Sequence, residues 1–311
     1  MANVYLYIVG VQVMTYNKIE VRKVTPRIGA EVFGVDLSKE LDDVTFKEIH
    51  KALLENQVIF FRNQEMGLEQ HKDFGRRFGE LHVHPASPSP KGHPEILNIH
   101  ADGNSTRVAG ETWHTDVSCD LEPPMASILK LHQVPSAGGD TLFSSMYAAY
   151  DALSPTLKEF LKTLTAVHSG EHVYRGRYNY DKGQREDSKD KFPEHEHPVV
   201  RTHPESGRQS LYVNSGFTTR IVGLEKDESD ALLSFLFAHN AKPQFQCRFR
   251  WANNSIAMWD NRCVQHYAMW DYYPEVRSGY RVTVKGDRPF FDKKGWEGKL
   301  NRYVKNSQDA A

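Results

Sequence analysis

The chain has 311 residues, of which 39% are hydrophobic and 25% are charged, and its formal net charge is −1. These values are typical of a globular protein with a large core. A net charge so close to zero gives no general attraction to nucleic acid or to an anionic membrane, so we expect neither as a partner.

The N-terminal sequence MANVYLYIVGVQVM is apolar but too short to span a bilayer, and no basic stretch precedes it as in a signal peptide. We interpret residues 1–13 as an N-terminal extension of a single domain over 14–311. The cysteines Cys119, Cys247 and Cys263 are far apart and form no C-x-x-C motif. They predict buried thiols in a protein of the reducing cytoplasm, rather than disulfides or a cysteine-rich zinc site.

Helical and strand patterns follow one another without an internal repeat or a linker rich in proline and glycine. Ser154 and Pro155 have the N-cap and first-position preferences of a helix, and residues 245–251 alternate apolar and polar side chains as a half-buried strand does. In chain order the predicted elements are helix 45–56, strands 57–62 and 126–134, helix 154–164, strand 210–214, helix 227–240 and strands 245–251, 255–259 and 281–286.

The stretch 175–198 is polar and densely charged, and it predicts a long mobile surface loop near that position. Loops of this size inside a domain often lie over a binding site. The stretch contains the sequence His195-Glu196-His197, which we interpret as solvated residues rather than metal ligands.

Two His-x-Asp sequences occur, His100-Ala101-Asp102 and His114-Thr115-Asp116. About one such sequence is expected by chance, so the motif alone proves nothing. On a β-strand, residues i and i+2 point to the same side, and a His-x-Asp pair can then present an imidazole and a carboxylate to one metal ion. Gly103 and Asn104 predict a turn directly after the first pair, which favours His114 and Asp116.

The segment 259–290 supplies a third candidate ligand, His266, followed by Arg277 and Arg281. The two arginines share a face if the segment is a strand, and a buried arginine requires an anion. Two histidines and one carboxylate form the facial triad of non-haem iron oxygenases, although zinc hydrolases also use this set. The H-E-x-x-H motif of metalloproteases is absent, which favours iron.

With these residues the chain resembles the taurine dioxygenase family, the α-ketoglutarate-dependent group that includes chlorophenoxyacetate and alkylsulfate dioxygenases. The resemblance covers most of the chain. The matching segments are RIGAEVFGVDL, FGELHVHP, WHTDVSCDLEPP, GGDTLFSSM, HPVVRTHPESGRQSLYVNSGFTTRIV, WDNRCVQHYA and GDRPF.

The resemblance implies a mainly β fold with flanking helices, built on a double-stranded β-helix (jelly-roll) core. It implies that His114, Asp116 and His266 bind Fe(II), and that α-ketoglutarate and O2 are cosubstrates, with ascorbate as an expected aid in vitro. It also implies that Arg277 and Thr141 hold the α-ketoglutarate carboxylate remote from the metal, as a guanidinium and a hydroxyl can.

For the substrate, the resemblance implies that a sulfonate is held by His84, by Arg281 and by the backbone at Val117, with Phe217 beside it. On the residues alone, His84 and Phe217 could instead be structural, and Arg281 could pair with Asp287.

Other family positions differ. Ser87 stands where the family has Tyr, and Gly110 where it has Asn. Val173-Tyr174 replaces a Ser-Phe pair, and Tyr174 could contact the substrate or simply fill the core. The end of the site that would hold the amine of taurine has therefore lost polar partners, while taurine itself stays a candidate.

We therefore expect a cytoplasmic homo-oligomeric enzyme of sulfur metabolism that hydroxylates the carbon next to an anionic group of a small organic substrate. A sulfonate is favoured, either taurine or a less polar alkanesulfonate, with release of sulfite and an aldehyde together with succinate and CO2. An alkyl sulfate ester and an aryloxyalkanoate are alternative substrates. A zinc-dependent hydrolase and a jelly-roll binding protein without activity are the rival classes.

Overall fold

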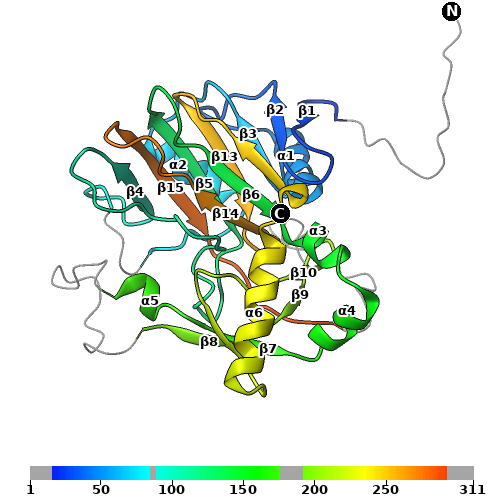
Figure 1. Cartoon of the computed structure of the whole chain (residues 1–311). Coiled ribbons are helices and arrows are strands. Elements are labelled where there is room, and N and C mark those ends of the chain that lie inside the picture. Colours follow the sequence, from blue (N-terminus) through cyan, green and yellow to red (C-terminus); the bar gives the residue numbers. More distant parts are fainter. Residues whose placement is uncertain (1–15, 85–88, 176–191, 293–311) are drawn as a thin grey trace, which may run out of the picture.

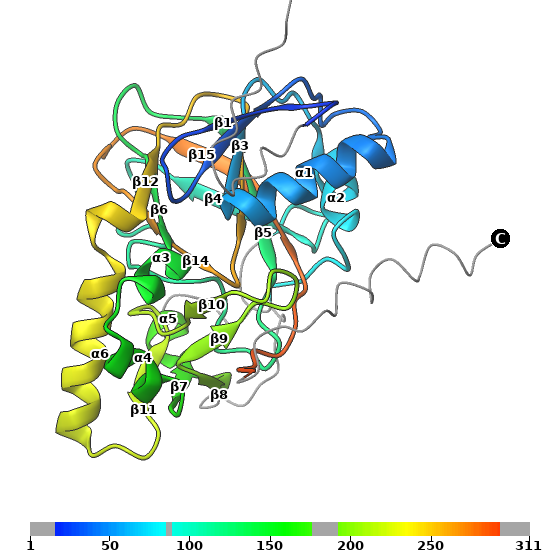
Figure 2. The ribbon, with the colours of Figure 1, turned by 90° about the vertical axis from the view of Figure 1, so that its right-hand side faces the viewer.

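The computed structural model describes residues 16–84, 89–175 and 192–292 (Figures 1 and 2). The largest sheet has the strand order β1-β2-β3-β13-β5-β15-β4, and a smaller sheet has the order β12-β6-β14. The strands of the largest sheet, in this order, are Glu20–Lys23, Ala30–Phe33, Val58–Phe61, Ser255–Asp260, Ala126–Gln133, Arg277–Val284 and Ile96–Ala101. Those of the smaller sheet are Gln246–Phe249, Thr141–Ser145 and Val264–Ala268.

Strand β3 has the sequence VIFF and explains how the layers form. Val58 and Phe60 belong to a core cluster shared with residues of the smaller sheet, whereas Ile59 and Phe61 belong to a cluster on the opposite face. All four side chains are buried, because the central strands of the large sheet are covered on both faces. Phe60 stacks on Phe249 of β12 with 4.0 Å between ring centroids, which joins the two sheets. The two facing sheets form a jelly-roll core.

Two helices cover the outer face of the large sheet, as Figure 2 shows. They are α1 (Asp43–Asn56) and α2 (Leu68–Arg76). The side chain of Asp42 accepts the amides of Val44 and Thr45 and so begins α1. Helix α1 turns the buried residues Ile49 and Leu53 toward the sheet.

A second unit of short strands and helices extends from the other end of the core. Its helices include α6 (Lys226–Asn240), which contacts α3 and β11. The remaining elements are α3 (Met146–Asp151), α4 (Pro155–Leu161), β7 (Thr165–Ser169), α5 (Glu171–Tyr174), β8 (Glu194–Pro198), β9 (Val200–Thr202), β10 (Gln209–Leu211), β11 (Thr218–Ile221) and η2 (Pro243–Phe245).

All nine predicted elements are found within a few residues of their expected bounds, and Ser154 accepts the amide of Leu157 as the N-cap of α4. The three cysteines are free and buried, as predicted. The predicted loop 175–198 is wrong at its end, where residues 194–198 form strand β8 and pair with β7. Residues 1–13 and most of the predicted loop lie outside the described ranges.

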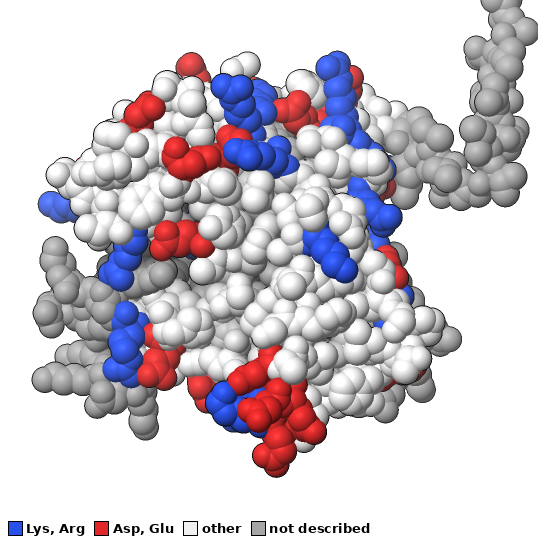
Figure 3. Space-filling model, viewed as in Figure 1, with Lys and Arg blue, Asp and Glu red and all other residues white. Residues whose placement is uncertain are grey.

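No helix in the described part of the chain is long and apolar enough to cross a membrane. On the face shown in Figure 3, acidic and basic side chains are interspersed, and acidic side chains gather at the lower tip, over the start of α6. The oligomeric state and the cytoplasmic location stay predictions.

Candidate active site

A cavity lies between the two sheets, and its walls come from segments far apart in the sequence. His266 lies on β14 of the smaller sheet, whereas Arg277 and Arg281 lie on β15 of the larger sheet. Every predicted site residue in the described ranges lines this cavity, while Ser87 lies outside those ranges. The predicted residues that line it are His84, Gly110, His114, Asp116, Val117, Thr141, Tyr174, Phe217, His266, Arg277 and Arg281.

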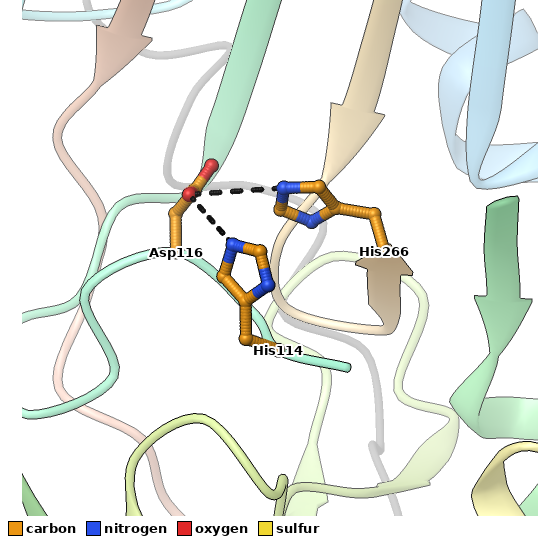
Figure 4. Close-up of side chains that lie close together, drawn as sticks. All are labelled: His114, Asp116 and His266. Carbon is orange, nitrogen blue, oxygen red and sulfur yellow. Dashed lines mark ion pairs between the residues drawn. The ribbon is translucent and has the colours of Figure 1, made fainter. Parts of the chain in front are cut away.

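Three of these side chains converge on one point, as Figure 4 shows for His114, Asp116 and His266. The Oδ1 atom of Asp116 lies 3.6 Å from Nε2 of His114 and 3.9 Å from Nε2 of His266. One ligand atom from each residue lies within 4.8 Å of the others. The exposed fraction of each residue is below a tenth, and all three are partners a metal ion accepts.

The protonation pattern at this point also fits a cation. Nδ1 of His114 lies 2.7 Å from the carbonyl oxygen of Thr112 and donates its hydrogen there, so Nε2 is the ring nitrogen that faces Asp116. Burial, and next the neighbouring His114, hold the pKa of His266 well below its usual value, which favours the neutral imidazole of His266. Burial alone would raise the pKa of Asp116, but Arg281 and the two imidazoles outweigh it and hold that pKa well below its usual value.

The His-x-Asp pair converges for a different reason from the one predicted. His114 forms only an isolated bridge with His266, and the chain turns at Asp116 instead of continuing as a strand. The backbone of His114 exchanges two hydrogen bonds with that of His266, at 3.2 and 2.8 Å. The rival pair lies elsewhere, with His100 exposed on β4 and Asp102 accepting the amide of Asn104 in a turn.

Two polar residues that the sequence did not single out hold the carboxylate in place. Ser127 of β5 donates to Oδ2 of Asp116 at 2.6 Å, which leaves Oδ1 facing the histidines. The side-chain oxygen of Asn261 accepts the amide of Asp116 at 3.3 Å, and Asn261 donates to Ser127 at 3.0 Å. Their sequence positions give no hint of this role, because the three residues meet only through sheet register.

Arg277 lies at the start of β15 and forms no ion pair with any described residue. Its Nε donates to the carbonyl oxygen of Gly139 at 3.0 Å, and Nη2 lies 3.4 Å from Oγ1 of Thr141. Trp251 donates to the same hydroxyl at 3.0 Å, and its ring centroid lies 5.6 Å from the guanidinium carbon. Burial lowers the pKa of Arg277, since the charged form lacks a paired carboxylate. This end of the cavity is therefore prepared for an anion.

Arg281 faces the other side of the triad. Its Nη1 lies 2.8 Å from Oδ1 of Asp116, and its Nε is buried without a partner among the described residues. Asp287, its alternative partner on the residues alone, pairs instead with Arg201. His84 lines the same region, and burial, followed by the charge of Arg281, lowers its pKa to about 3.

Val117 follows Asp116 with φ +49°, a conformation that β-branched residues rarely adopt. Among the described residues, no acceptor takes its amide hydrogen. Val117, His84 and Arg281 all line the cavity, and together they can bind an anionic group.

The wall beside this region is aromatic. The ring centroid of Tyr174 lies 5.9 Å from that of His84 and 6.2 Å from that of Phe217. Gly110 has φ +87°, and a β-carbon there would lie 3.2 Å from Cε1 of His114, so any side chain at this position would crowd a triad histidine. Apart from Asp116, no carboxylate lines the described cavity.

A second cluster, of His203, Asp260 and Cys263, also brings metal-ligating side chains together. Here Arg262 contacts the Asp260 carboxylate at 2.8 and 2.7 Å, and Nε2 of His203 lies 3.0 Å from it. These partners fill the position that a metal would need, so this cluster is structural.

A jelly-roll core that presents two imidazoles and a carboxylate beside an unpaired buried arginine fits the class of metal-dependent dioxygenases that use a 2-oxo acid. The family model described as "Taurine catabolism dioxygenase TauD, TfdA family" matches residues 20–283. An α-ketoglutarate-dependent sulfate ester dioxygenase of Pseudomonas putida is 38% identical, over 92% of this chain and 94% of that protein.

An α-ketoglutarate-dependent sulfonate dioxygenase of Saccharomyces cerevisiae is 36% identical, over 89% of this chain and 69% of that protein. The crystal structure of a taurine dioxygenase from Burkholderia xenovorans aligns with a TM-score of 0.77 and 37% identity, covering 91% of this chain and 97% of that one. The chain therefore belongs to the TauD, TfdA family of dioxygenases. Its cosubstrates are α-ketoglutarate and O2, and its metal is Fe(II).

Proposed function

We propose that the enzyme oxidises the carbon next to a sulfonate or sulfate ester group in a small organic substrate with an apolar tail. Hydroxylation of that carbon gives a product that collapses to an aldehyde with release of sulfite or sulfate. The observation that carries the proposal is that Arg281, His84 and Val117 line the same cavity as the triad, with Arg281 in contact with Asp116 and no acceptor among the described residues for the Val117 amide. The sulfonate and sulfate ester dioxygenases among the relatives support the same substrate class.

In this proposal His114, Asp116 and His266 hold Fe(II), and Ser127 orients the carboxylate by holding Oδ2. When bound, Fe(II) activates O2 and couples decarboxylation of α-ketoglutarate, to succinate and CO2, with oxidation of the substrate C–H bond. Arg277 and the Thr141 hydroxyl bind the remote carboxylate of α-ketoglutarate. Because the Thr141 oxygen accepts from Trp251, its own hydrogen can point to that carboxylate.

Arg281 and His84 act by positioning. A guanidinium can hold two oxygens of a sulfonate or sulfate at once, and the amide of Val117 can hold the third. An anion fixed at three oxygens directs the adjacent carbon toward the triad, and such orientation lowers the barrier because the entropy cost of alignment is met on binding. Arg281 contacts Asp116 now, and a substrate anion offers it an alternative partner.

The tail specificity follows from the aromatic wall beside the residues that hold the anion. Among the described residues of the cavity, the ammonium group of taurine would find no carboxylate other than Asp116, which faces the histidines. Tyr174, Phe217 and Val173 offer apolar surface instead. We infer that alkyl tails without a charged end are preferred to the aminoethyl tail of taurine.

The test uses purified enzyme with Fe(II), ascorbate and α-ketoglutarate, and a panel of taurine, pentanesulfonate, hexyl sulfate and phenoxyacetate. Succinate, sulfite and sulfate are measured together, because succinate alone does not prove substrate oxidation. Higher kcat/KM for pentanesulfonate or hexyl sulfate than for taurine supports the proposal. Succinate and phenol formation only with phenoxyacetate would move the enzyme to aryloxyalkanoates, the second candidate, since Arg281 can hold a carboxylate equally well.

A further inference from the structure

The turn that follows the triad aspartate is under backbone strain. Val117 has φ +49°, and the amide of Asp120 closes the turn by donating to the carbonyl oxygen of Val117 at 3.0 Å. A β-branched residue keeps this conformation only where surrounding contacts hold it. The contacts that hold residues 118–120 therefore decide where the Val117 amide points.

Two histidines of strand β8 make such contacts with the backbone of the turn. Nδ1 of His195 lies 2.7 Å from the carbonyl oxygen of Cys119, and Nε2 of His197 lies 2.9 Å from that of Asp120. Residues i and i+2 of a strand point to one side, so a single short strand presents both rings to two successive carbonyl groups. These are the two histidines that the sequence suggested were solvated, and that interpretation is wrong for His197, which is buried.

The side chain of Ser118 also fixes the turn. The hydroxyl of Ser118 contacts Nδ1 of His168 at 3.0 Å and accepts from Asn214 at 3.0 Å. His168 pairs with His195 in the register of β7 and β8, so the two strands form one backing for the turn.

The protonation state of His197 suits a permanent donor. Its Nδ1 is buried without a partner among the described residues, while Nε2 faces an acceptor, which fits the neutral tautomer with its hydrogen on Nε2. Burial, as the largest cause, lowers the pKa of His197 to about 4, so the ring stays neutral at neutral pH.

We propose that His195 and His197 are positioning residues that hold the Cys119 and Asp120 carbonyl groups and thereby aim the Val117 amide at the anionic group of the substrate. The effect on substrate rests on the function proposed above, whereas the effect on the turn does not. His197→Leu removes the donor and keeps the volume, and His197→Gln keeps an N–H donor near the position of Nε2. His239→Leu is the matched control, because Nε2 of His239 also donates to a carbonyl oxygen, that of Ala149 at 2.8 Å, and its Nδ1 is also buried without a described partner.

The first measurement is amide hydrogen exchange of the full-length chain by mass spectrometry. We expect His197→Leu to speed exchange in peptides covering 117–121 by about 5- to 10-fold, as loss of one hydrogen bond allows, with His197→Gln near wild type and His239→Leu unchanged there. Exchange in 117–121 that does not differ between His197→Leu and wild type would overturn the proposal.

The second measurement is steady-state kinetics with whichever substrate of the panel is oxidised. We expect the KM for that substrate to rise about 5- to 10-fold in His197→Leu and to recover in His197→Gln, while the KM for α-ketoglutarate changes less than about twofold. Equal KM values despite faster exchange would also overturn the positioning role. Faster exchange in an enzyme that oxidises none of the panel would leave the histidines as holders of the turn and refute the proposed substrate class instead.

Discussion

The cluster of His114, Asp116 and His266 and the cluster of His203, Asp260 and Cys263 are built from the same kinds of side chain, and both are buried. In the second cluster each polar atom has a protein partner. Both oxygens of Asp260 are taken by Arg262 and His203, and Nδ1 of His203 accepts the amides of Glu205 and Ser206. In the first cluster Oδ1 of Asp116 faces Nε2 of His114 at 3.6 Å and Nε2 of His266 at 3.9 Å, and both distances are longer than an ordinary hydrogen bond.

The buried arginines differ in the same way. Arg262 contacts two carboxylates, Asp260 and Glu205, and both partners are largely buried. Arg277 contacts no carboxylate within the described ranges and donates only to a carbonyl and a hydroxyl oxygen. A buried charge without a counter-charge is costly, so the arrangement around Arg277 is favourable only if a ligand supplies the missing anion. Burial of the residues does not distinguish the two clusters, whereas the completeness of their partners does.

The largest expected effect follows from Asp116→Ala, which removes the triad oxygen. Binding of Mn(II), measured by isothermal titration calorimetry as a stand-in for Fe(II), should weaken by more than about 100-fold, because loss of a residue outside the ligand shell already costs 10- to 100-fold. Succinate formation should be lost with it. Asp260→Asn is the contrast, and equal weakening of Mn(II) binding in that variant would contradict the division into a metal site and a structural cluster.

Arg262→Leu tests the structural side of the comparison. It leaves Asp260 and Glu205 buried without their counter-charge, so we expect the free energy of unfolding to fall by about 3–5 kcal/mol. Urea unfolding followed by circular dichroism measures this loss. The folded fraction should keep wild-type Mn(II) affinity, and a variant as stable as wild type would mean that the Arg262 network contributes little.

The sequence predicted the triad more fully than it predicted what holds the triad in place. Spacing and residue type suggested His114, Asp116 and His266, although the expected strand geometry was wrong and the pair converges through a bridge and a turn. The roles of Ser127 and Asn261 could not be predicted from the sequence. Their contacts with Asp116 depend on the pairing of β5 with β13 and on the path of the chain directly after β13.

Polar composition misled the prediction for the segment that ends at residue 198. His195 and His197 look solvent-exposed in a charged stretch. Their ring nitrogens nevertheless contact backbone carbonyl groups of a turn that lies 76 and 77 residues earlier in the chain. A polar pattern reports how many hydrogen bonds a segment needs, and it does not report whether water or backbone supplies them. The apolar strands were predicted well because burial of such residues does not depend on a particular partner.

Arg277→Gln sharpens the comparison of the arginines. Hydrogen bonds to charged groups contribute about 1.5–3 kcal/mol, so we expect the KM for α-ketoglutarate to rise by about 10- to 100-fold. Mn(II) affinity should be unchanged, because Arg277 does not contact the triad oxygen. The matched variant is Arg281→Gln, which should instead raise the KM for the sulfonate or sulfate ester. An unchanged KM for α-ketoglutarate in Arg277→Gln would remove Arg277 from that role.

The smallest effect concerns Glu205, which belongs to the structural network through Arg262 and His50. Burial alone would raise its pKa, but the hydrogen bond from His50 and the charge of Arg262 lower it to about 2 from 4.5. A carboxyl with a depressed folded pKa stabilises the protein above its unfolded pKa, and this contribution is lost as the pH falls from about 4.5 toward 2.

Glu205→Gln should therefore be less stable than wild type at pH 7, by about 1–2 kcal/mol after allowance for partial exposure, and the difference should shrink as the pH falls through that window. Urea midpoints at several pH values measure it, with the exposed Glu40→Gln as the control. A difference that stays constant with pH would show that the loss comes from packing. Glu205 would then not share the charge-paired character that separates its cluster from the triad.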